Sequence, residues 1–548
     1  MLLTRSVSGQ RSQCIGLQGQ KRSWLRCVAV SSAATEVAAT EFEWKGSDEF
    51  SALEDRKDLP PLPLPPIKTH RRVVLVRHGQ STWNAEGRIQ GSSNFSCLTP
   101  KGIAQAETTR DMLKNDVQKF DTLYVSPLTR ATQTADIITS GMGLRSVTLP
   151  SLREIDLFSF QGLLKGEGRL RYGDAWGMWQ KQADAFATDG HAPVRELWYR
   201  ASLAWQDILS DKDSPEKAVM VVAHNAVNQA LIGSALGLPP RYFRRLLQSN
   251  AATTVLDFQP GPTDSSTPRV TVDRLNQSPG RPYAADAGGR PPCGRLVLIR
   301  HAATDADAKG LLLGSRDEPL NGLGNVQAGK VAEFLLDMKV HSVMTSPARR
   351  CLSTAQLVAQ LQVEASRMGS AVAAGSQASK PPRVLVMPEL RNLEMGMWEG
   401  QSMRMVADRG GLPAAAATAA AGAAGPALAP DSPGYSAGLE DLGEFWYRTA
   451  AAWNKLLDAV DHNGGSNVVV VCHAATAAAL ASHCLQLGPE GLPLMRFDAA
   501  GVSIIDFPDG ARSGGVMRCL NYTAHLGRWA VPITRDDMDM VCGIDGCF

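Results

Sequence analysis

Short runs of consecutive apolar residues alternate along the chain with longer segments in which apolar residues return every three or four positions. The first run, at 72–77, reads Arg-Val-Val-Leu-Val-Arg, and further apolar runs lie within 121–126 and 219–224. Such runs are typical of strands buried on both faces, and the wider spacing at 129–139 and 226–236 predicts amphipathic helices. This alternation predicts an α/β fold in which a mainly parallel sheet carries helices on both faces.

The whole pattern occurs twice. The segment VVLVRHGQSTWN at 73–84 returns as LVLIRHAATDAD at 296–307, and three later landmarks return in the same order. Repetition of a complete strand-and-helix pattern predicts two tandem domains of one fold, which we expect at 71–261 and 293–532. The later landmarks are SPLTRATQTA at 126–135 with SPARRCLSTA at 346–355, LREIDLFSFQG at 152–162 with LRNLEMGMWEG at 390–400, and VVAHNAVNQAL at 221–231 with VVCHAATAAAL at 470–480.

The segments outside these domains have compositions of their own. Prolines crowd the end of 46–70, and 262–292 is rich in Gly, Pro, Ser and Asp, so we expect both to be linkers. Residues 1–35 contain no acidic residue but interleave arginines and a lysine with serines. That composition is typical of an organellar transit peptide, and we expect 1–45 to be a transit peptide and disordered N-terminus. A basic disordered tail is the alternative, and composition does not separate plastid from mitochondrion.

Composition and charge narrow the possible partners. The 548 residues include 56 basic and 54 acidic side chains, and this balance leaves no global field to hold nucleic acid. No apolar run approaches the roughly 18 residues of a membrane span. The ten cysteines form no C-x-x-C pair, so no metal site is expected. Cys542 and Cys547 flank Gly-Ile-Asp-Gly in the tail expected at 533–548, where a reversible disulfide and two unconnected thiols are both open.

Candidate chemistry lies at the ends of the predicted strands. His78 and His224 each follow a buried strand, and the carboxyl ends of parallel strands form the usual ligand site of such sheets. Arg77, Arg88 and Arg130 supply planar forks that match phosphate oxygens. A neutral imidazole can attack phosphorus and form a covalent intermediate. These residues therefore predict a phosphate site with a histidine nucleophile.

Phosphoryl transfer from an ester also requires a proton for the leaving oxygen. The loop after Leu152 offers two carboxylic acids, Glu154 and Asp156, and the sequence leaves the choice between them open.

In this combination of motifs the chain resembles the histidine phosphatase superfamily, also called the phosphoglycerate mutase-like family, over both expected domains. The resemblance implies that His78 is the phosphorylated nucleophile and Glu154 the general acid and base. It implies a mechanism that uses no metal and no other cofactor. The remaining residues implied for the first domain are Arg77, Arg130 and His224 in the phosphate pocket, and Asn84, Arg88, Gln90 and Gly91 in substrate binding.

The resemblance also suggests a substrate. Glu-Ile-Asp-Leu-Phe at 154–158 replaces the Glu-Arg-His-Tyr-Gly of the mutases, which favours the phosphatases of the family. Similarity to plant members implies a small phosphorylated sugar acid, 2-carboxy-D-arabinitol 1-phosphate, and the chloroplast stroma as location. This compound inhibits Rubisco, so a functional link to Rubisco follows, and Arg88, Arg153 and Arg195 are candidate partners for its carboxylate. A broader sugar-bisphosphate phosphatase, a phosphoglycerate mutase and a non-catalytic phosphate-sensing scaffold stay open as alternatives.

The second domain departs from the family pattern at three positions. Gly79, Asn84 and Glu154 are matched there by Ala302, Asp307 and Asn392, while the other pocket residues are retained. We therefore expect a degenerate domain that binds anions but turns over slowly, unless Glu394, the match to Asp156, acts as the acid. The retained counterparts are Arg300, His301, Arg350 and His473.

Overall fold

The computed structural model describes residues 59–114, 120–210, 218–261, 263, 265–278, 280–284, 288–367, 382–402, 439–462 and 465–526. Both copies of the repeat fall largely within these ranges. The transit peptide expected at 1–45, most of the linker expected at 46–70, and the tail at 533–548 with Cys542 and Cys547 lie outside the described residues. No helix within the described ranges is long and apolar enough to cross a membrane.

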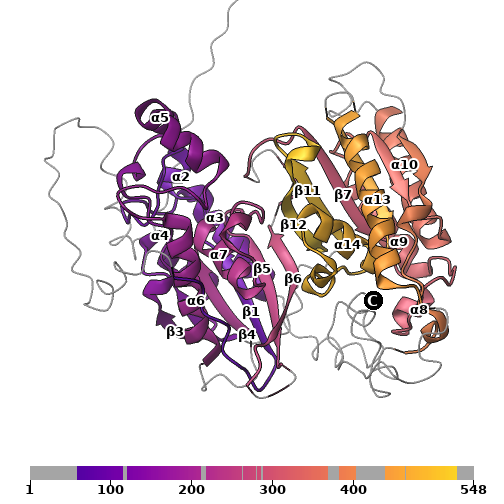
Figure 1. Cartoon of the computed structure of the whole chain (residues 1–548), viewed down its shortest axis with the longest axis horizontal. Coiled ribbons are helices and arrows are strands. Elements are labelled where there is room, and N and C mark those ends of the chain that lie inside the picture. The colour runs from indigo at the N-terminus through magenta and orange to yellow at the C-terminus, as the bar shows by residue number, and fades with distance from the viewer. Residues whose placement is uncertain are drawn as a thin grey trace, which may run out of the picture. The chain divides into compact units, whose positions relative to one another are not determined.

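The first copy contributes six strands to a sheet (Figure 1), namely β1 (Arg71–Arg77), β2 (Phe120–Val125), β3 (Arg145–Thr148), β4 (Ala218–Ala223), β5 (Thr253–Gln259) and β6 (Arg269–Gln277). Strands β3, β2, β4 and β1 lie side by side in that order and run parallel. Strand β5 pairs antiparallel with the free side of β1, and β6 pairs antiparallel with β5. Arg77 lies opposite Ala223 in the register of β1 and β4, so the two strands end at one edge.

The second copy contributes the equivalent six strands, β7 (Gly294–Arg300), β8 (Ser342–Thr345), β9 (Arg383–Val386), β10 (Asn467–Cys472), β11 (Val502–Phe507) and β12 (Val516–Tyr522). The order across all twelve strands is β3-β2-β4-β1-β5-β6-β12-β11-β7-β10-β8-β9. Each strand of the first copy therefore has its counterpart at the mirrored place in the second half of this order. The halves meet where β6 pairs antiparallel with β12, with Leu275 opposite Leu520.

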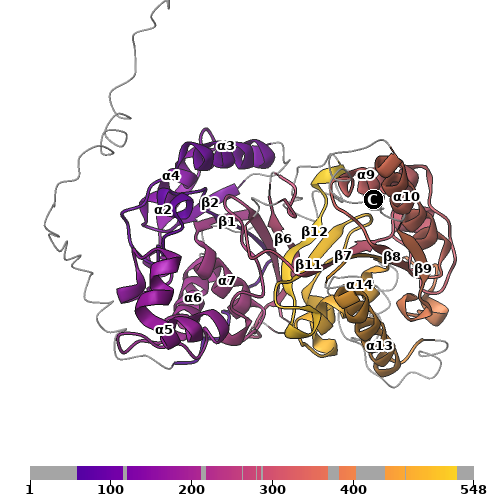
Figure 2. The same ribbon diagram turned by 90° about the horizontal axis from the view of Figure 1, so that it is seen from above.

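Helices cover both faces of the first-copy strands (Figure 2). Apolar residues of α3 and α4 pack with Val74 and Val76 on one face, and those of α6 and α7 pack with Val73 and Leu75 on the other. Because successive strand residues point to opposite faces, one apolar run supplies both cores. The helices of this copy are α2 (Thr82–Glu86), α3 (Pro100–Lys114), α4 (Thr129–Ile138), α5 (Lys165–Lys181), α6 (Pro193–Ser210) and α7 (Asn225–Ala235).

The second copy repeats this arrangement. Val297 and Ile299 pack with α9 and α10 on one face of the sheet, and Leu296 and Leu298 pack with α13 and α14 on the other. Its helices are α8 (Asp305–Ala308), α9 (Gly322–Phe334), α10 (Arg349–Arg367), α13 (Leu442–Asp461) and α14 (Ala474–Cys484). Short 3₁₀ turns complete both copies, as η1 (Pro150–Leu152), η2 (Phe158–Phe160), η3 (Pro240–Tyr242), η4 (Pro388–Leu390), η5 (Gly396–Trp398), η7 (Pro489–Leu494), η8 (Ala511–Ser513) and η9 (Ala524–Leu526).

The α/β fold with two copies and helices on both faces is confirmed, and two details of the expectation change. The sheet is mixed, because β5 and β11 each pair antiparallel with both of their neighbours, and β6 pairs antiparallel with β12. The linker expected at 262–292 contains strand β6, Arg269–Gln277, so that part of the expectation is wrong. Turn-forming residues around it dominate the composition, but Val270, Val272 and Leu275 are buried in the core.

Candidate active site

Two histidines of the first copy lie together at the carboxyl edge of the sheet. His78 directly follows β1, His224 directly follows β4, and their ring centroids are 5.1 Å apart. His224 Nε2 hydrogen-bonds Ser126 Oγ, which follows β2, at 2.7 Å. Three neighbouring parallel strands thus deliver these side chains to one place, as the strand ends predict.

The geometry around His78 leaves one ring nitrogen available. Its Nδ1 lies 2.7 Å from the carbonyl oxygen of Gly79, and a carbonyl only accepts, so Nδ1 carries the proton and Nε2 bears the lone pair. Burial lowers the pKa of His78 well below its usual value, and the charges of Arg130 and Arg77 lower it further. The imidazole is therefore neutral near pH 7, which is the state required of a nucleophile.

Arg77 and Arg130 are each tethered by part of the guanidinium group. Arg77 donates from one terminal nitrogen to the carbonyl of Gln248 at 2.6 Å, and Arg130 donates to the carbonyls of Ser93 at 2.7 Å and Gly91 at 2.9 Å. Burial lowers the pKa of both arginines to about 10, so both remain charged near pH 7.

Three buried polar atoms of this pocket have no hydrogen-bond partner within the part of the chain that the structure describes. They are Arg77 Nε, Arg130 Nε and His224 Nδ1. Buried polar groups in native proteins are almost always paired, so unpaired ones beside two cations indicate a site that an anion completes.

Glu154 lies at the N-terminus of α7, the helix that begins directly after His224. Its carboxylate accepts hydrogen bonds from the backbone N–H groups of Ile155, Ala226 and Val227 at 2.9 to 3.1 Å, and the residue is 8% exposed. Asp156 instead accepts from the backbone N–H of Phe158 in its own turn, at 3.2 Å, and is less buried. Of the two acids left open by the sequence, the structure places Glu154 beside the pocket.

The residues implied for substrate binding have different surroundings. Asn84 accepts from Asn250 Nδ2 at 3.3 Å, and the same amide donates to the carbonyl of His78 at 3.1 Å, which ties Asn84 to the pocket. Gly91 supplies the carbonyl that holds Arg130, and Gln90 Oε1 is buried without a partner in the described ranges. Arg88 is engaged by Glu86 Oε2 at 2.6 Å and by the carbonyl of Gly162 at 2.9 Å.

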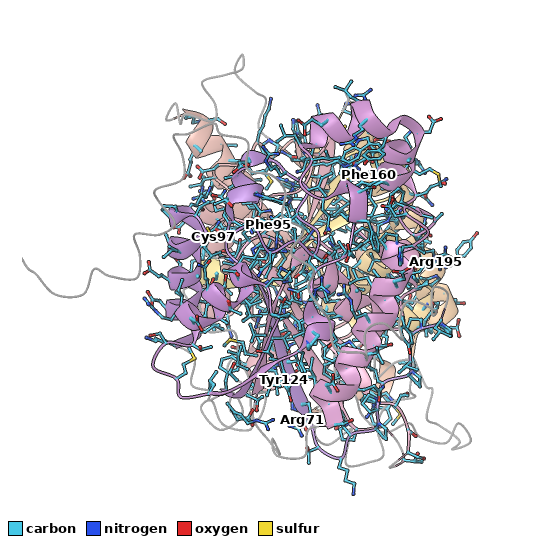
Figure 3. The ribbon with its side chains drawn as sticks, turned by 90° about the vertical axis from the view of Figure 1, so that its left-hand side faces the viewer. Arg71, Phe95, Cys97, Tyr124, Phe160 and Arg195 are labelled. Carbon is cyan, nitrogen blue, oxygen red and sulfur yellow. The ribbon has the colours of Figure 1, made fainter. Side chains whose placement is uncertain are left out.

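Aromatic side chains of η2 and α5 pack against one another, and Figure 3 labels one of them, Phe160. Phe160 stacks on Tyr172 of α5, with ring centroids 4.2 Å apart. Arg195, a candidate partner for a substrate carboxylate, lies on the exposed side of the first turn of α6. Arg153 is partly buried and follows η1.

Some residues that shape the pocket were missed by the sequence reasoning. The carbonyls of Gln248 and Ser93 hold the two arginines, and Asn250 bridges His78 and Asn84. Backbone carbonyls can come from any residue type, so no side-chain pattern reveals Gln248 and Ser93.

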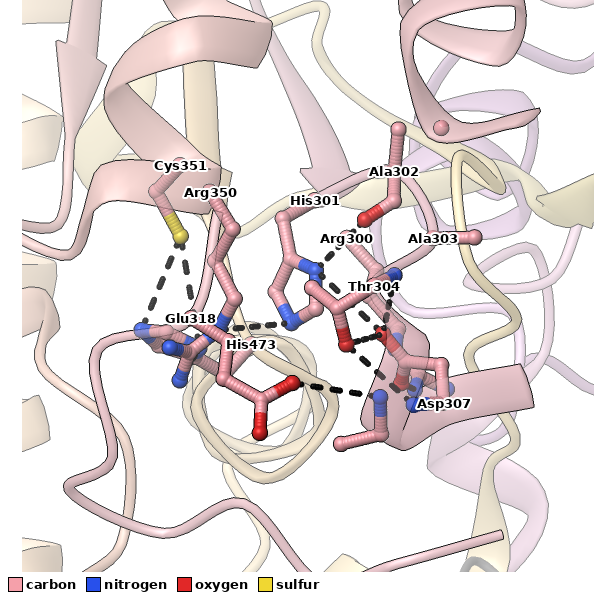
Figure 4. Close-up of polar contacts among 12 residues, drawn as sticks. Arg300, His301, Ala302, Ala303, Thr304, Asp307, Glu318, Arg350, Cys351 and His473 are labelled. Atoms are coloured by element: carbon pink, nitrogen blue, oxygen red, sulfur yellow. Dashed lines mark hydrogen bonds and ion pairs between the residues drawn. The ribbon is translucent and has the colours of Figure 1, made fainter. Parts of the chain in front are cut away.

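The second copy brings its counterparts together in the same way (Figure 4). His301 and His473 have ring centroids 5.3 Å apart, and His473 Nε2 lies 2.9 Å from Ser346 Oγ. Asn392, at the position of Glu154, donates to the carbonyl of Gly314 at 3.2 Å. Glu394 is 44% exposed and lies 3.4 Å from Arg391, so the structure places it at the surface and not in the pocket.

In the described ranges, no group of three or more His, Cys, Asp or Glu residues could hold a metal ion. Arg77 and Arg130 bring two positive charges to the first pocket, which suits an anion.

Known proteins resemble this chain over most of its length. The family model described as histidine phosphatase superfamily (branch 1) matches residues 73–268 and 296–519. A Triticum aestivum protein, "2-carboxy-D-arabinitol-1-phosphatase", is 43% identical over 86% of this chain and 90% of its own length. An Arabidopsis thaliana protein, "Probable 2-carboxy-D-arabinitol-1-phosphatase", is 41% identical over 86% of this chain and 91% of its own.

Bacterial proteins match a shorter part of the chain. An Enterobacter protein, "Probable phosphoglycerate mutase GpmB", is 33% identical over 35% of this chain and 86% of its own length. Among solved structures, "Mycobacterial hydrolase 1" covers 38% of this chain and 99% of its own, with 27% identity and a TM-score of 0.35.

Proposed function

Because the chain belongs to the histidine phosphatase superfamily, we propose that its first copy hydrolyses 2-carboxy-D-arabinitol 1-phosphate to the sugar acid and inorganic phosphate. The observation that carries the phosphatase chemistry is the lone pair on Nε2 of a neutral His78, in a pocket with the buried Arg77 and Arg130, whose Nε donors have no partner in the described ranges. The substrate rests on the two plant relatives, which share 41% and 43% identity over 86% of the chain.

The reaction takes two steps at this site. His78 Nε2 attacks phosphorus, the bond to the ester oxygen breaks, and the phosphoryl group is transferred to the imidazole. Arg77 and Arg130 stabilise the charge on the phosphoryl oxygens through their Nε donors, which have no partner in the part of the chain that the structure describes. A protonated Glu154 gives its proton to the leaving alkoxide, which departs as the alcohol.

The second step restores the enzyme. Glu154, now a carboxylate, takes a proton from a water molecule, whose oxygen attacks the phosphorus of phosphohistidine. The bond to Nε2 breaks, inorganic phosphate leaves, and both His78 and Glu154 return to their starting states.

The deciding experiment is a substrate panel on the full chain, with release of phosphate measured beside isomerisation. The panel contains 2-carboxy-D-arabinitol 1-phosphate, sugar bisphosphates, sugar monophosphates and 3-phosphoglycerate. We expect the highest kcat/KM for the first compound. Faster release from sugar bisphosphates would make the enzyme a broader phosphatase, and isomerisation of phosphoglycerate would make it a mutase. An acid-labile phosphohistidine that is absent from His78→Ala excludes a non-catalytic scaffold.

We also propose that the enzyme works without a metal, because arginines and imidazoles supply the positive groups that phosphoryl transfer requires. Activity is expected to survive EDTA treatment unchanged. Loss of activity on chelation, with recovery on addition of Mg²⁺, would contradict this mechanism.

The proposed location is the chloroplast stroma, where hydrolysis would remove an inhibitor of Rubisco. The acid-free, serine-rich and arginine-rich composition of 1–35 supports import into an organelle. The two plant relatives, and Rubisco as the target of the inhibitor, favour the chloroplast. A fusion of residues 1–60 to a fluorescent protein is expected to enter chloroplasts in plant cells. Import into mitochondria, or retention in the cytosol, would overturn the proposed location but leave the chemistry untouched.

A further inference from the structure

The two pockets share a scaffold but differ in how their polar groups are used. In the first pocket, Arg77 Nε, Arg130 Nε and His224 Nδ1 have no partner in the described ranges. In the second pocket the matching donor of Arg350 is used, because its Nε donates to His301 Nε2 at 3.2 Å. Arg300 Nε, like Arg77 Nε, has no partner in the described ranges, so the two pockets differ in the arginine donor of α10, which is used, and that of α4, which is unpaired.

The remaining contacts of Arg350 strengthen this difference (Figure 4). A terminal nitrogen of Arg350 lies 3.3 Å from His473 Nδ1, which must accept because a guanidinium only donates. The atom that corresponds to the nucleophile, His301 Nε2, also serves as an acceptor. His301 Nε2 and His473 Nδ1 therefore both accept hydrogen bonds from Arg350.

Asp307 provides the second cation with a counterion. Its Oδ1 lies 2.5 Å from a terminal nitrogen of Arg300, and its Oδ2 lies 4.0 Å from His301 Nδ1. Burial opposes ionisation of this carboxyl, but Arg300, His301 and the donors of Thr304 lower its pKa. Asp307 is therefore a carboxylate near pH 7, and it neutralises the charge of Arg300 within the pocket.

The first copy carries an uncharged amide at the same position. Asn84 caps α2 together with Ser81, just as Asp307 caps α8 together with Thr304. The geometry of the two capping boxes is the same, so the substitution changes the charge and not the fold of the turn. Asn84 therefore adds no negative charge beside Arg77.

We propose that Asp307 is a built-in counterion that prevents the second copy from binding phosphate, so that the residue at this position, Asn84 or Asp307, decides which copy binds. A phosphate monoester carries up to two negative charges, and a buried carboxylate a few ångströms away repels it strongly in a site with little water. The second copy is then not a weak phosphatase that merely lacks its acid, as the sequence suggested, but a pocket closed to the substrate class. This inference holds whichever sugar phosphate the first copy hydrolyses.

The test is the number of tetrahedral anions that the full chain binds. Orthovanadate is titrated into the phosphate-free protein and the stoichiometry is measured by calorimetry. We expect one site per chain in the wild type, two sites in Asp307→Asn and no site in Asn84→Asp. The gained site of Asp307→Asn is expected to bind at least about tenfold more tightly than the same pocket in the wild type.

Asp305→Asn is the matched control, because it removes the same charge from an exposed position in the same helix. It is expected to keep one site. Asp307→Asn should also keep the phosphatase activity of the first copy and the wild-type circular dichroism spectrum, since Asn84 shows that an amide supports this cap.

Two results would overturn the proposal. One is a wild-type chain that binds two anions with similar affinity, because the second pocket would then be open despite Asp307. The other is an Asp307→Asn variant that is folded and active but still binds one anion, because the charge at this position would then not be what closes the pocket.

Discussion

At the residue scale, the chemistry of the first copy depends on a few protons with defined places. Gly79 holds the proton of His78 on Nδ1, and the N-terminus of α7 holds the Glu154 carboxylate beside the pocket. Glu154 reaches this place through backbone donors, so its position does not depend on the bound phosphate. Binding and proton transfer are therefore separable by substitution.

Glu154→Gln is the substitution that separates them. The amide keeps the size of the side chain but cannot donate a proton and take it back, so kcat is expected to fall by about 10²-fold or more while orthovanadate still binds. Asp156→Asn is the control, because Asp156 accepts within its own turn, and near-normal kcat is expected. If Asp156→Asn were the variant that lost activity, the role of acid would pass to Asp156.

A second prediction concerns the two nucleophile positions. His78→Ala is expected to reduce phosphatase activity to background, and His301→Ala is expected to retain most of it. Among the described residues no donor is bound to His78 Nε2, and Glu154 lies in the same pocket, whereas His301 Nε2 accepts from Arg350 and Asn392 replaces the acid. Steady-state rates of the two variants on one substrate decide this. Similar partial losses from both would mean that the chain has two active sites.

At the element scale, one loop holds the phosphate-binding arginine of α4. Gly91 has a φ of +53° and its carbonyl accepts from Arg130, while Gln161 packs so closely that an added Cβ would lie 2.0 Å from its Oε1. The same Oε1 accepts from the backbone N–H of Ser92 at 2.6 Å. The loop that contains Gly91 and the turn that contains Gln161 therefore fix the position of the Arg130 guanidinium together.

Gly91→Ala is expected to loosen this anchor and raise KM by about tenfold, the cost of roughly one hydrogen bond to a charged group. Gly87→Ala is the control, because Gly87 also has a positive φ, +73°, but has open space around its Cβ position. Gly87→Ala therefore introduces backbone strain without a steric clash. Equal KM values for the two variants would show that strain, and not the anchor, is responsible.

The elements themselves could be predicted closely from the sequence. The runs at 72–77 and 219–224 differ by one residue from β1 and β4, because a strand buried on both faces leaves an uninterrupted apolar run. Strand β6 could not be found in the same way, because Thr271, Asp273 and Arg274 interrupt its apolar residues. These polar side chains are paired by contacts that only the folded chain makes, such as Arg274 with Asp498 and Thr271 with the carbonyl of Pro493.

The candidate site shows the same limit. The strand-end histidines and arginines have recognisable side chains in a recognisable order, so the sequence locates them. What it could not supply is how Arg77 and Arg300 differ, since that depends on the 2.5 Å contact between Arg300 and Asp307. In the sequence this difference is one residue, Asn84 in the first copy and Asp307 in the second. Its effect on the charge of the second pocket becomes visible only in the folded chain.

At the scale of the whole molecule, both copies bury a pair of neutral histidines. Burial lowers the pKa of His78, His224 and His473 well below the usual value and that of His301 to about 3. In the unfolded chain each of these groups takes up a proton as the pH falls below about 6.5, while the folded chain does not. Stability is therefore fully present above that pH and falls below it.

We expect the free energy of unfolding to fall by about 1.4 kcal/mol per pH unit for each such histidine below pH 6.5. Urea unfolding of the phosphate-free protein at pH 7.5, 6.5 and 5.5 measures this. The carboxylates with lowered pKa values, such as Asp257, titrate below this range and do not oppose the trend. A midpoint that stays constant or rises between pH 6.5 and 5.5 would show that the histidines are protonated in the folded state.

The order of the twelve strands also determines what the sheet offers to other molecules. Its two outer positions are taken by β3 and β9, the equivalent strands of the two copies, and each is only four residues long. A sheet grows by recruiting further chains along an exposed edge, and short edge strands give such recruitment little length to use. Joining the copies through β6 and β12 removes two further edges from solvent. Tandem duplication in this order thus produces a sheet whose two edge strands are both short. Leu385 and Val386 of β9 are 43% and 51% exposed, so the β9 edge is the one more open to aggregation.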